Sequence, residues 1–190
     1  HYELDKKILE LPGDVIELGV FKGSSLIQFS IFRTLLENEK SRKIIGFDVF
    51  GEFPQGNKIE SDKLFVDQWN LSHRNTFLSM EEIYKSLENK GIHNVNLIKG
   101  DICETVDIYL NENPHTKISL LHIDTDIYEP SKVGIEKLFE RVVRGGVIIF
   151  DDYATVEGET KAIDEFLSDK DYIIKKFTFS HCKPSYIIKK

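Results

Sequence analysis

Cysteine is scarce in this sequence, and long apolar runs are missing. The two cysteines, Cys103 and Cys182, are too few and too far apart for a disulfide framework or a thiolate metal site. No apolar run approaches the roughly 20 residues that a helix needs to cross a bilayer, and no signal-type segment opens the chain. We therefore expect a cytoplasmic protein with no membrane partner.

Basic residues are outnumbered as well. The 25 lysines and arginines stand against 32 aspartates and glutamates, which gives a net charge of −7. A protein that binds the phosphate backbone of nucleic acid usually carries a basic face, so we expect no nucleic-acid partner. With 41% hydrophobic and 30% charged residues, the chain is of ordinary globular composition, and 190 residues fit one domain. We expect a single folded domain over residues 1–190.

Short apolar runs alternate with segments of helical periodicity along most of the chain. Strands are predicted at Asp14–Val20, Lys43–Asp48, Asn94–Lys99, Lys117–Asp124 and Gly146–Phe150. Helices are predicted at Ser24–Glu37, Phe77–Lys90, Glu104–Asn113, Pro130–Val143 and Glu159–Ser168. Because the strands are almost continuously apolar, they indicate a parallel sheet buried on both faces. The predicted fold class is α/β, with a Rossmann-like, doubly wound and mostly parallel sheet.

Two segments depart from this alternation. Val49–Arg74 is of mixed character and is punctuated by Gly51, Pro54 and Gly56, so we expect a functional loop or lid there. At the C-terminal end, two β-rich runs, Tyr172–Phe179 and Ser185–Lys189, flank a short turn. This arrangement predicts an antiparallel hairpin.

The first predicted strand runs through a glycine-containing turn directly into a helix, with the residues E-L-G-V-F-K-G-S-S at positions 17–25. Such a turn lets a ligand approach the backbone closely, and the helix N-terminus offers free N–H groups. A dinucleotide fingerprint would have glycine where Phe21 stands, so the spacing favours a nucleoside ligand without a pyrophosphate. A plain tight turn with Ser24 as the helix N-cap is the alternative.

Carboxylates follow the next two strands. Asp48 ends the second strand, where an acidic residue binds the ribose hydroxyls in doubly wound nucleotide folds. The third strand ends in Gly100 and Asp101, again a small residue and a carboxylate. In open parallel sheets the ligand lies outside the carboxyl ends of the strands, so these positions are candidates for ligand binding.

Four more carboxylates follow the last two predicted parallel strands. Asp124 and Asp126 stand two residues apart after one strand, and Asp151 and Asp152 follow the other. Four carboxylates in one crevice would repel one another unless a cation shared them. Oxygen ligands suit a hard divalent ion, of which Mg²⁺ is the expected one. The alternative is that these residues cap the helices that follow.

Four other residues have two interpretations each. His122 is expected to be buried, either in the core or behind the acidic residues. Trp69 and Tyr153 are candidates for lining a substrate pocket, with a place in the core as the alternative. Cys103 is expected to pack rather than to act as a nucleophile, because no basic group is placed to lower its pKa.

Five stretches between Leu11 and Leu167 together resemble one enzyme family. They are E-L-G-V-F-K-G-S, G-F-D-V-F-G-E-F-P, K-G-D-I-C-E-T, H-I-D-T-D-I-Y-E-P and R-G-G-V-I-I-F-D-D-Y-A-T-V-E-G-E-T-K-A-I-D-E-F. The sequence resembles the macrocin O-methyltransferase family, whose members are class I enzymes that use S-adenosylmethionine and Mg²⁺ to methylate sugar hydroxyls. The resemblance also implies an antiparallel hairpin joined to the end of the parallel sheet.

The resemblance implies a role for each matching residue. The cofactor-binding residues would be Glu17, Gly19, Ser24 and Ser25 at the methionine and sulfonium end, Asp48 at the ribose, and Asp101 with Ile102 beside the adenine. The metal-binding residues would be Asp124, Asp151 and Asp152. Asp126 would be the general base, so that Asp124 and Asp126 form the catalytic pair.

These observations predict an O-methyltransferase that acts on a sugar or on a glycosylated or nucleotide-linked small molecule. Metal coordination would lower the pKa of the sugar hydroxyl, and Asp126 would take its proton. A metal-dependent nucleotide-sugar glycosyltransferase, a haloacid-dehalogenase-like phosphatase and a non-catalytic cofactor-binding module are the alternatives. Members of the family have a longer N-terminal region that often helps to build the acceptor pocket and the dimer, so a homodimer or higher oligomer is an expected assembly.

Overall fold

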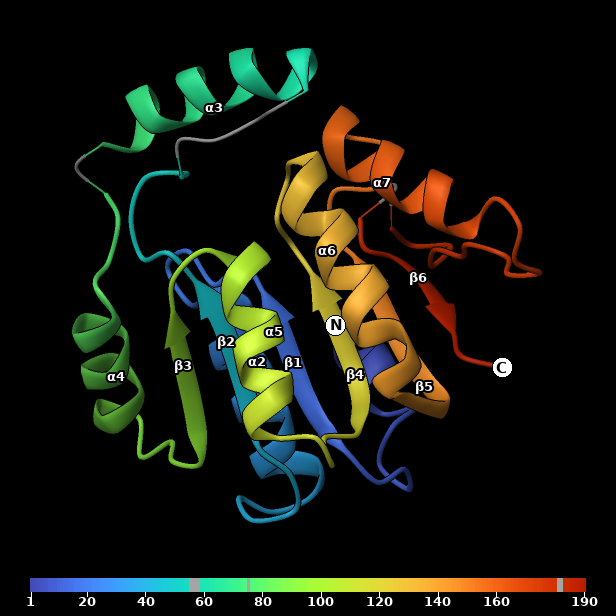
Figure 1. Ribbon diagram of the computed structural model, residues 1–190. Helices are drawn as coiled ribbons and strands as arrows, with labels where there is room; N and C mark the ends of the chain where they lie inside the picture. Colours follow the sequence, from blue (N-terminus) through green and yellow to red (C-terminus); the bar gives the residue numbers. More distant parts are fainter. Residues whose placement is uncertain (55–58, 75, 181–182) are drawn as a thin grey trace.

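The computed structural model describes residues 1–54, 59–74, 76–180 and 183–190. Its centre is a six-stranded sheet in the order β3-β2-β1-β4-β5-β6 (Figure 1). The strands are β1 (Asp14–Leu18), β2 (Ile44–Asp48), β3 (Val95–Lys99), β4 (Ile118–Ile123), β5 (Val142–Phe150) and β6 (Ser185–Ile188). The first five are parallel, and β6 pairs antiparallel with β5. The strand order reverses between β1 and β4, which places the switch point of a doubly wound sheet there.

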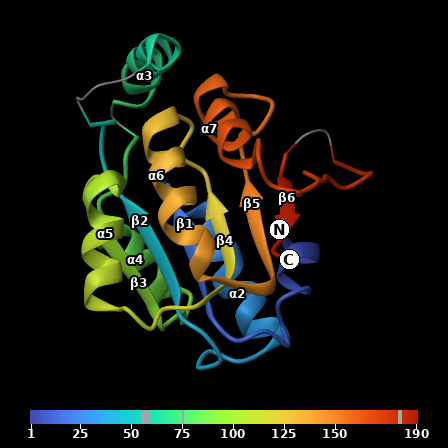
Figure 2. The same cartoon turned by 45° about the vertical axis from the view of Figure 1, so that its right-hand side comes forward.

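Helices cover both faces of this sheet (Figures 1 and 2). They are α1 (Tyr2–Asp5), α2 (Ser24–Leu36), α3 (Glu60–His73), α4 (Met80–Asn89), α5 (Ile102–Glu112), α6 (Tyr128–Leu138) and α7 (Glu157–Leu167), with a 3-10 turn at Phe139–Arg141. Alternate strand residues divide the core: Ile16 and Leu18 pack with α5, α6 and α7, whereas Val15 packs with α1, α2 and α4. The α/β prediction is confirmed. None of the helices in the described residues is long and apolar enough to span a bilayer.

The largest difference from the prediction lies between β2 and α4. The expected loop Val49–Arg74 contains the helix α3, which lies beyond the carboxyl ends of the strands (Figure 1). Its apolar residues do not follow one stripe, because Leu64 and Leu71 are exposed while Val66 is buried on another side. A helical period is therefore hard to recognise in this segment. The lid role of the segment is untested, and Gly56 lies outside the described residues.

The C-terminal segment forms one edge strand rather than two paired strands. β6 continues the sheet along β5, from the pair Val147 and Ile188 to the pair Phe150 and Ser185. The run Tyr172–Phe179 contributes a single bridge, from Lys175 to Tyr186, and is largely exposed. The predicted antiparallel end of the sheet is thus confirmed, but its partner is β5 and not the preceding run.

Other predicted boundaries shift by a few residues. α5, α6 and α7 each begin two residues before the predicted position, and α6 ends at Leu138. β5 begins at Val142, four residues before the predicted Gly146, so the end of the predicted helix Pro130–Val143 belongs to the strand. Pro130 is tolerated inside α6 because it lies in the first turn, where the helix makes no use of its N–H.

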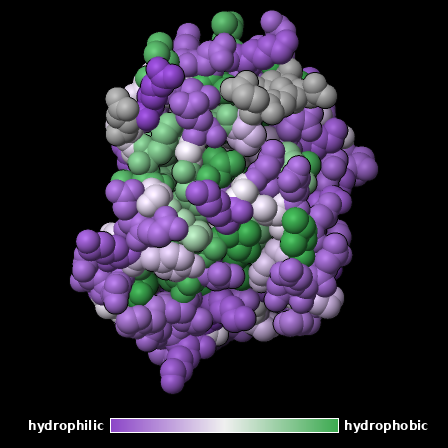
Figure 3. Space-filling model, turned by 60° about the vertical axis from the view of Figure 1, so that its left-hand side comes forward, coloured by the Kyte–Doolittle hydropathy of each residue, from purple (hydrophilic) through white to green (hydrophobic). Residues whose placement is uncertain are grey.

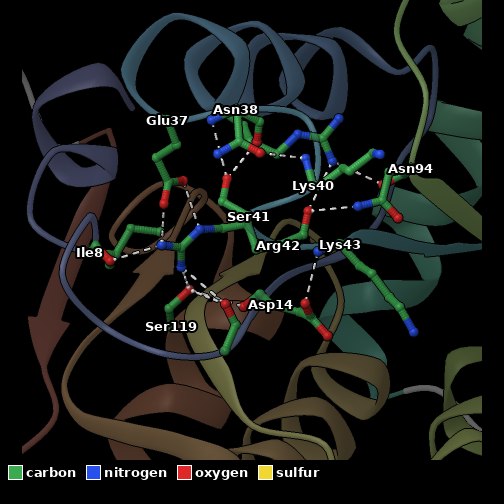
Figure 4. A network of polar contacts seen from close by, with 12 residues as sticks. Ile8, Asp14, Glu37, Asn38, Lys40, Ser41, Arg42, Lys43, Asn94 and Ser119 are labelled. Atoms are coloured by element: carbon green, nitrogen blue, oxygen red, sulfur yellow. Dashed lines mark hydrogen bonds and ion pairs between the residues drawn. The ribbon is translucent and has the colours of Figure 1, made fainter.

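The buried guanidinium of Arg42 links several segments at the amino ends of the strands (Figure 4). Arg42 makes a two-pronged pair with Glu37, with N···O distances of 2.6 and 2.8 Å. It also donates to the Ser119 hydroxyl at 2.6 Å and to the carbonyls of Gly13 and Ile8 at 3.0 and 3.1 Å. One side chain thereby joins the end of α2 to β4 and to the segment before β1.

Candidate functional site

A cavity of about 740 Å³ lies at the carboxyl ends of the parallel strands, at the switch point. Its walls come from the segments that follow β1 to β5 and from α3. The predicted site residues that line it are Gly19, Asp48, Asp101, Ile102, Asp124, Asp126, Asp151 and Asp152. Glu17, Ser24 and Ser25 are absent from the described lining. Ligands of doubly wound sheets bind at this position.

Asp48 fixes the turn after β1. Its Oδ2 accepts the backbone N–H groups of Val20 and Phe21 at 2.7 and 2.8 Å, and its Oδ1 accepts that of Phe50 at 2.6 Å. Phe21 has a φ of 48°, a conformation that glycine adopts at less cost. These bonds use three of the roughly four acceptor sites of the carboxylate, so Asp48 positions the turn and keeps one site for a ligand.

Glu17 lies behind the cavity wall, fully buried in β1. Its Oε1 accepts a short hydrogen bond from the Ser25 hydroxyl and lies 3.1 Å from Nδ1 of His122. Its Oε2 has no hydrogen-bond partner among the described residues. Ser24 does not cap α2, because the N-cap is Gly23 and no side-chain cap is present, so that alternative is wrong.

His122 connects Glu17 to one of the strand-end acids. The imidazole is fully buried, as predicted, and its Nε2 lies 3.5 Å from Oδ1 of Asp151. Burial disfavours the charged ring, but hydrogen bonds to Asp151 and Glu17 outweigh it and raise the pKa of His122 well above its ordinary value. Burial likewise opposes the ionised form of Asp151, yet the hydrogen bond and charge of His122 lower the pKa of that carboxyl. His122, which lies beneath the site, thus stabilises the ionised form of Asp151.

The predicted metal-binding residues meet at the ends of β4 and β5. Asp124, Asp151 and Asp152 each place a carboxylate oxygen within 4.8 Å of the others. Burial, together with the neighbouring acids, raises the pKa of Asp124 well above its ordinary value. Three carboxylate oxygens this close together suit a hard divalent cation.

Asp126 completes the acidic cluster. Burial raises its pKa to about 9, and the charge of Asp152 and a hydrogen bond to it add to the effect. Neither α6 nor α7 has a side-chain N-cap, so the alternative that the four acids serve as helix caps is wrong. Asp101 differs, because its Oδ1 accepts the N–H of Cys103 at 2.9 Å and caps α5 while it lines the cavity.

Two residues that were not predicted from the sequence contact the acidic cluster or the backbone that carries it. Lys183 contacts Oδ1 of Asp152 and lies 4.0 Å from Oδ2 of Asp151. Fully buried Glu159 accepts the backbone N–H groups of Asp152 and Thr125 at 3.0 and 3.4 Å. Glu159 lies in the V-E-G-E-T stretch of the family motifs, whereas no sequence signal distinguishes Lys183 from the other lysines near the terminus.

Aromatic rings form another part of the cavity wall. The rings that line it are those of Phe21, Phe53, Phe65, Trp69 and Phe77. Trp69 therefore borders the cavity, and its contact with a substrate stays a prediction. Tyr153 instead packs beside the core and donates its hydroxyl to Asp164 at 2.7 Å. Burial, with Asp101 nearby, raises the pKa of Cys103 to about 12, which agrees with its predicted inert role.

Comparison with known proteins places the chain in a family. The model of the macrocin-O-methyltransferase (TylF) family matches residues 6–176. The 8-demethyl-8-(2,3-dimethoxy-alpha-L-rhamnosyl)-tetracenomycin-C 4'-O-methyltransferase of Streptomyces olivaceus is 28% identical over 150 residues, which cover 76% of this chain and 54% of that protein. The demethyldecarbamoylnovobiocin O-methyltransferase of Streptomyces niveus is 27% identical over 163 residues, which cover 82% and 58% of the two chains. This chain thus spans a little over half the length of these relatives.

Solved structures agree with the match. The O-methyltransferase NovP superposes with a TM-score of 0.83 at 21% identity, over 99% of this chain and 77% of that one. The apo structure of CalS11, described as a TDP-rhamnose 3'-O-methyltransferase, superposes with a TM-score of 0.70 at 27% identity, over 98% and 75% of the two chains. Because the family model covers most of the sequence and the fold agrees, this chain belongs to the macrocin O-methyltransferase family.

Proposed function

We propose that this chain transfers a methyl group from S-adenosylmethionine to a hydroxyl of a sugar in a glycosylated or nucleotide-linked small molecule. The observation that carries the proposal is the cavity at the switch point, where carboxylates follow successive strands in a chain of this family. The family match gives no support to the phosphatase and glycosyltransferase alternatives. A cytoplasmic location and a homodimer or higher oligomer remain predictions.

The two ends of the cavity support two different tasks. At the ends of β1, β2 and β3, the close turn at Gly19 and the carboxylates of Asp48 and Asp101 suit a nucleoside-bearing cofactor. The contact of Glu17 with the methionine end of the cofactor stays a prediction, because this side chain is fully buried behind the cavity wall and its Oε2 has no hydrogen-bond partner among the described residues. At the ends of β4 and β5, the acidic cluster suits the acceptor hydroxyl.

Asp124, Asp151 and Asp152 would hold Mg²⁺, which when bound lowers the pKa of a coordinated hydroxyl. Asp126 would accept the hydroxyl proton. Burial and the charge of Asp152 raise the pKa of Asp126 to about 9, which disfavours the ionised form that a general base needs. A cation bound in the acidic cluster would favour the ionised form of Asp126, so the proposed base role of Asp126 depends on that cation.

Calorimetry with S-adenosylmethionine tests the proposal first. We expect saturable binding, and no binding at millimolar cofactor would contradict a methyltransferase. Methyl transfer is then followed by mass detection on a panel of glycosides and nucleotide-linked sugars with and without Mg²⁺. Binding of the cofactor without transfer to any acceptor would instead favour the non-catalytic module.

Three substitutions test the assigned roles. Asp151→Asn and Asp152→Asn should abolish Mg²⁺-stimulated turnover and leave cofactor binding largely intact, because the two residues lie at the acceptor end of the cavity. Asp126→Asn should lower the turnover number and leave Mg²⁺ binding measurable. Full activity in Asp151→Asn and Asp152→Asn would remove the metal role, and a full rate in Asp126→Asn would remove the base role.

A further inference from the structure

Glu159, in the first turn of α7, is a buried carboxylate to which the proposed function gives no role. Its side chain has no exposed surface. Its Oε1 accepts the backbone N–H of Asp152 at 3.0 Å, and its Oε2 accepts that of Thr125 at 3.4 Å. Its own backbone N–H donates to the carbonyl of Asp126 at 3.0 Å. One residue thereby joins the segment after β4 to the segment after β5.

These two segments carry the acidic cluster. In the first segment Thr125 stands between two of the acids, and in the second Asp152 is itself one of them. Among the described residues, the acids that could share one cation here are Asp124, Asp151 and Asp152, without Glu159. The Glu159 carboxyl group therefore contacts the backbone that carries the proposed ligands, and it is not one of the ligands itself.

The segment after β4 has a backbone conformation that needs support. Asp126 has a φ of 61°, which lies in the left-handed region that is costly for residues other than glycine. A residue keeps such a conformation only where its surroundings hold it. Glu159 supplies two hydrogen bonds to this turn, one to the Thr125 N–H and one to the Asp126 carbonyl. Without its side chain, the turn loses the first of these two restraints.

The first turn of α7 packs directly against the start of α6, so Glu159 has little freedom to move. Gly158 has no room for a side chain, since a Cβ there would lie 2.6 Å from the backbone nitrogen of Tyr128 and 2.2 Å from Oδ1 of Asp62. Asp62, on α3, also accepts the backbone N–H of Tyr128 at 2.8 Å. The N-terminal ends of α6 and α7 thus contact each other and α3.

The affinity of the cavity for a cation depends on how the acids are arranged. Mg²⁺ demands nearly octahedral geometry and short distances to its oxygen ligands. Another part of the wall is aromatic and offers no oxygen ligand; it includes Phe65 and Trp69, which stack on α3. Figure 3 shows apolar surface gathered on the side of the molecule that includes α3 and the β3 edge, with hydrophilic side chains around it. The aromatic part of the wall cannot replace a misplaced carboxylate.

We infer that Glu159 is a positioning residue of the proposed cation site, which fixes the acids after β4 relative to those after β5. The inference rests on the proposed function, in which these acids hold Mg²⁺. Substitution of residues that hold metal ligands in place typically lowers metal affinity by about 10- to 100-fold. We expect the effect on the cation and not on the cofactor, whose proposed position is at the ends of β1, β2 and β3.

Metal titration of the chain saturated with S-adenosylhomocysteine tests the inference. Mg²⁺ binding is measured by calorimetry, and Mn²⁺ binding by the electron paramagnetic resonance signal of the free ion. The bound S-adenosylhomocysteine stabilises the folded state by mass action, so a destabilised variant is still measured in its folded form. Glu159→Gln keeps the length of the side chain but replaces one acceptor oxygen by an NH₂ group. It should weaken the binding of both ions by about 10- to 100-fold and leave the affinity for S-adenosylhomocysteine largely unchanged.

Two further variants separate position from charge. Glu159→Asp keeps the carboxylate but is one methylene shorter, so it cannot reach both N–H groups at once. It should weaken Mg²⁺ binding by a factor similar to that of Glu159→Gln. Glu157→Gln is the matched control, because it removes a carboxylate from an exposed position in the first turn of the same helix, and it should leave Mg²⁺ affinity unchanged.

Three results would overturn the inference. The first is an unchanged Mg²⁺ affinity in Glu159→Gln. The second is a parent-like Mg²⁺ affinity in Glu159→Asp beside weak binding in Glu159→Gln, since Glu159 would then supply only its charge. The third is an equal loss of Mg²⁺ and S-adenosylhomocysteine affinity, which would mean general damage to the cavity. Failure of the parent chain to bind Mg²⁺ would refute the metal role and this inference with it, whereas failure to bind S-adenosylhomocysteine would refute the proposed function itself.

Discussion

Lys183 places a positive charge where the proposed cation would bind. Its ammonium contacts Asp152 and lies near Asp151, and half-exposed lysine stems are free to swing away. Mg²⁺ must displace or overcome this ammonium to reach the carboxylates. We therefore expect Lys183→Met to tighten Mg²⁺ binding about tenfold, corresponding to about 1.4 kcal/mol, as measured by calorimetric titration of the metal.

The control for this change is Lys117→Met, which removes one positive charge from an exposed position before β4, at the opposite end of the sheet. It should leave Mg²⁺ affinity unchanged. Weaker Mg²⁺ binding in Lys183→Met would mean that the lysine holds the carboxylates in position for the metal.

Gly19 shows how closely two strand ends approach beneath the cavity. Its φ is 88°, and a Cβ there would lie 1.8 Å from the carbonyl oxygen of Asp124. Gly19→Ala must therefore move the backbone that carries Asp124. The new alanine must also adopt a left-handed conformation, which costs about 1–2 kcal/mol. We expect Gly19→Ala to lose at least about 3 kcal/mol of unfolding free energy in urea, or to fail to fold. Gly51→Ala, with no atom within 4 Å of its Cβ, should stay close to the parent, and equal stability of the two variants would contradict this account.

The elements differ in how far the sequence predicts them. The structure confirms all five parallel strands. The central strands β1, β2 and β4 are buried almost throughout, so each is a short apolar run, whereas the edge strand β3 is only partly buried. Helix α3 is not predicted, because Leu64 and Leu71 face solvent while Phe65 and Trp69 face the cavity. Its position depends on contacts with α6 and α7 that sequence periodicity does not contain.

The residues of the candidate site also differ in how far the sequence predicts their positions. The strand-end aspartates could be placed together because parallel strands end at one edge of a sheet. The contacts of His122 with Glu17 and Asp151 could not be predicted, since they join side chains from β1, β4 and the residue after β5, and these strands become neighbours only in the folded sheet. Lys183 reaches the cluster from the segment before β6, whose pairing with β5 the predicted hairpin does not include.

The N-terminal end of α4 allows a prediction about what one helix cap contributes to stability. Ser79 accepts the N–H of Glu82 at 3.2 Å, and the Glu82 carboxylate accepts the N–H of Ser79 at 2.8 Å, which is a complete capping box. Ser79→Ala should lower the unfolding free energy by about 1 kcal/mol in a denaturant titration. Ser86→Ala, inside the same helix, should be neutral or slightly stabilising because alanine is the better helix former. Equal effects of the two changes would mean that the cap contributes nothing.

Across the whole molecule, the net charge of −7 overstates the charge that the folded chain carries near neutral pH. Burial raises the pKa of Asp126 to about 9 and that of Glu159 to about 8, with Asp152 adding to both. Both carboxyls are in the cavity region, and both bind protons more tightly in the folded than in the unfolded chain. By linkage, each contributes stability at low pH that is lost as the pH rises through its folded pKa.

Asp5, at the far end beside the Arg42 network, allows a direct test of this pH dependence. Burial raises its pKa from 3.8 to about 6, Glu37 adds to the shift and Arg42 opposes it, and Oδ2 has no partner among the described residues. Because the folded pKa is the higher one, its stabilising effect is complete below about pH 4 and is lost as the pH rises through about 6. Asp5→Asn should therefore raise the unfolding free energy at pH 7.5 by up to about 3 kcal/mol and change it little at pH 3.5. The exposed Glu3→Gln on the same helix is the control for charge alone, and an equal gain from Asp5→Asn at both pH values would show that ionisation of Asp5 is not the cause.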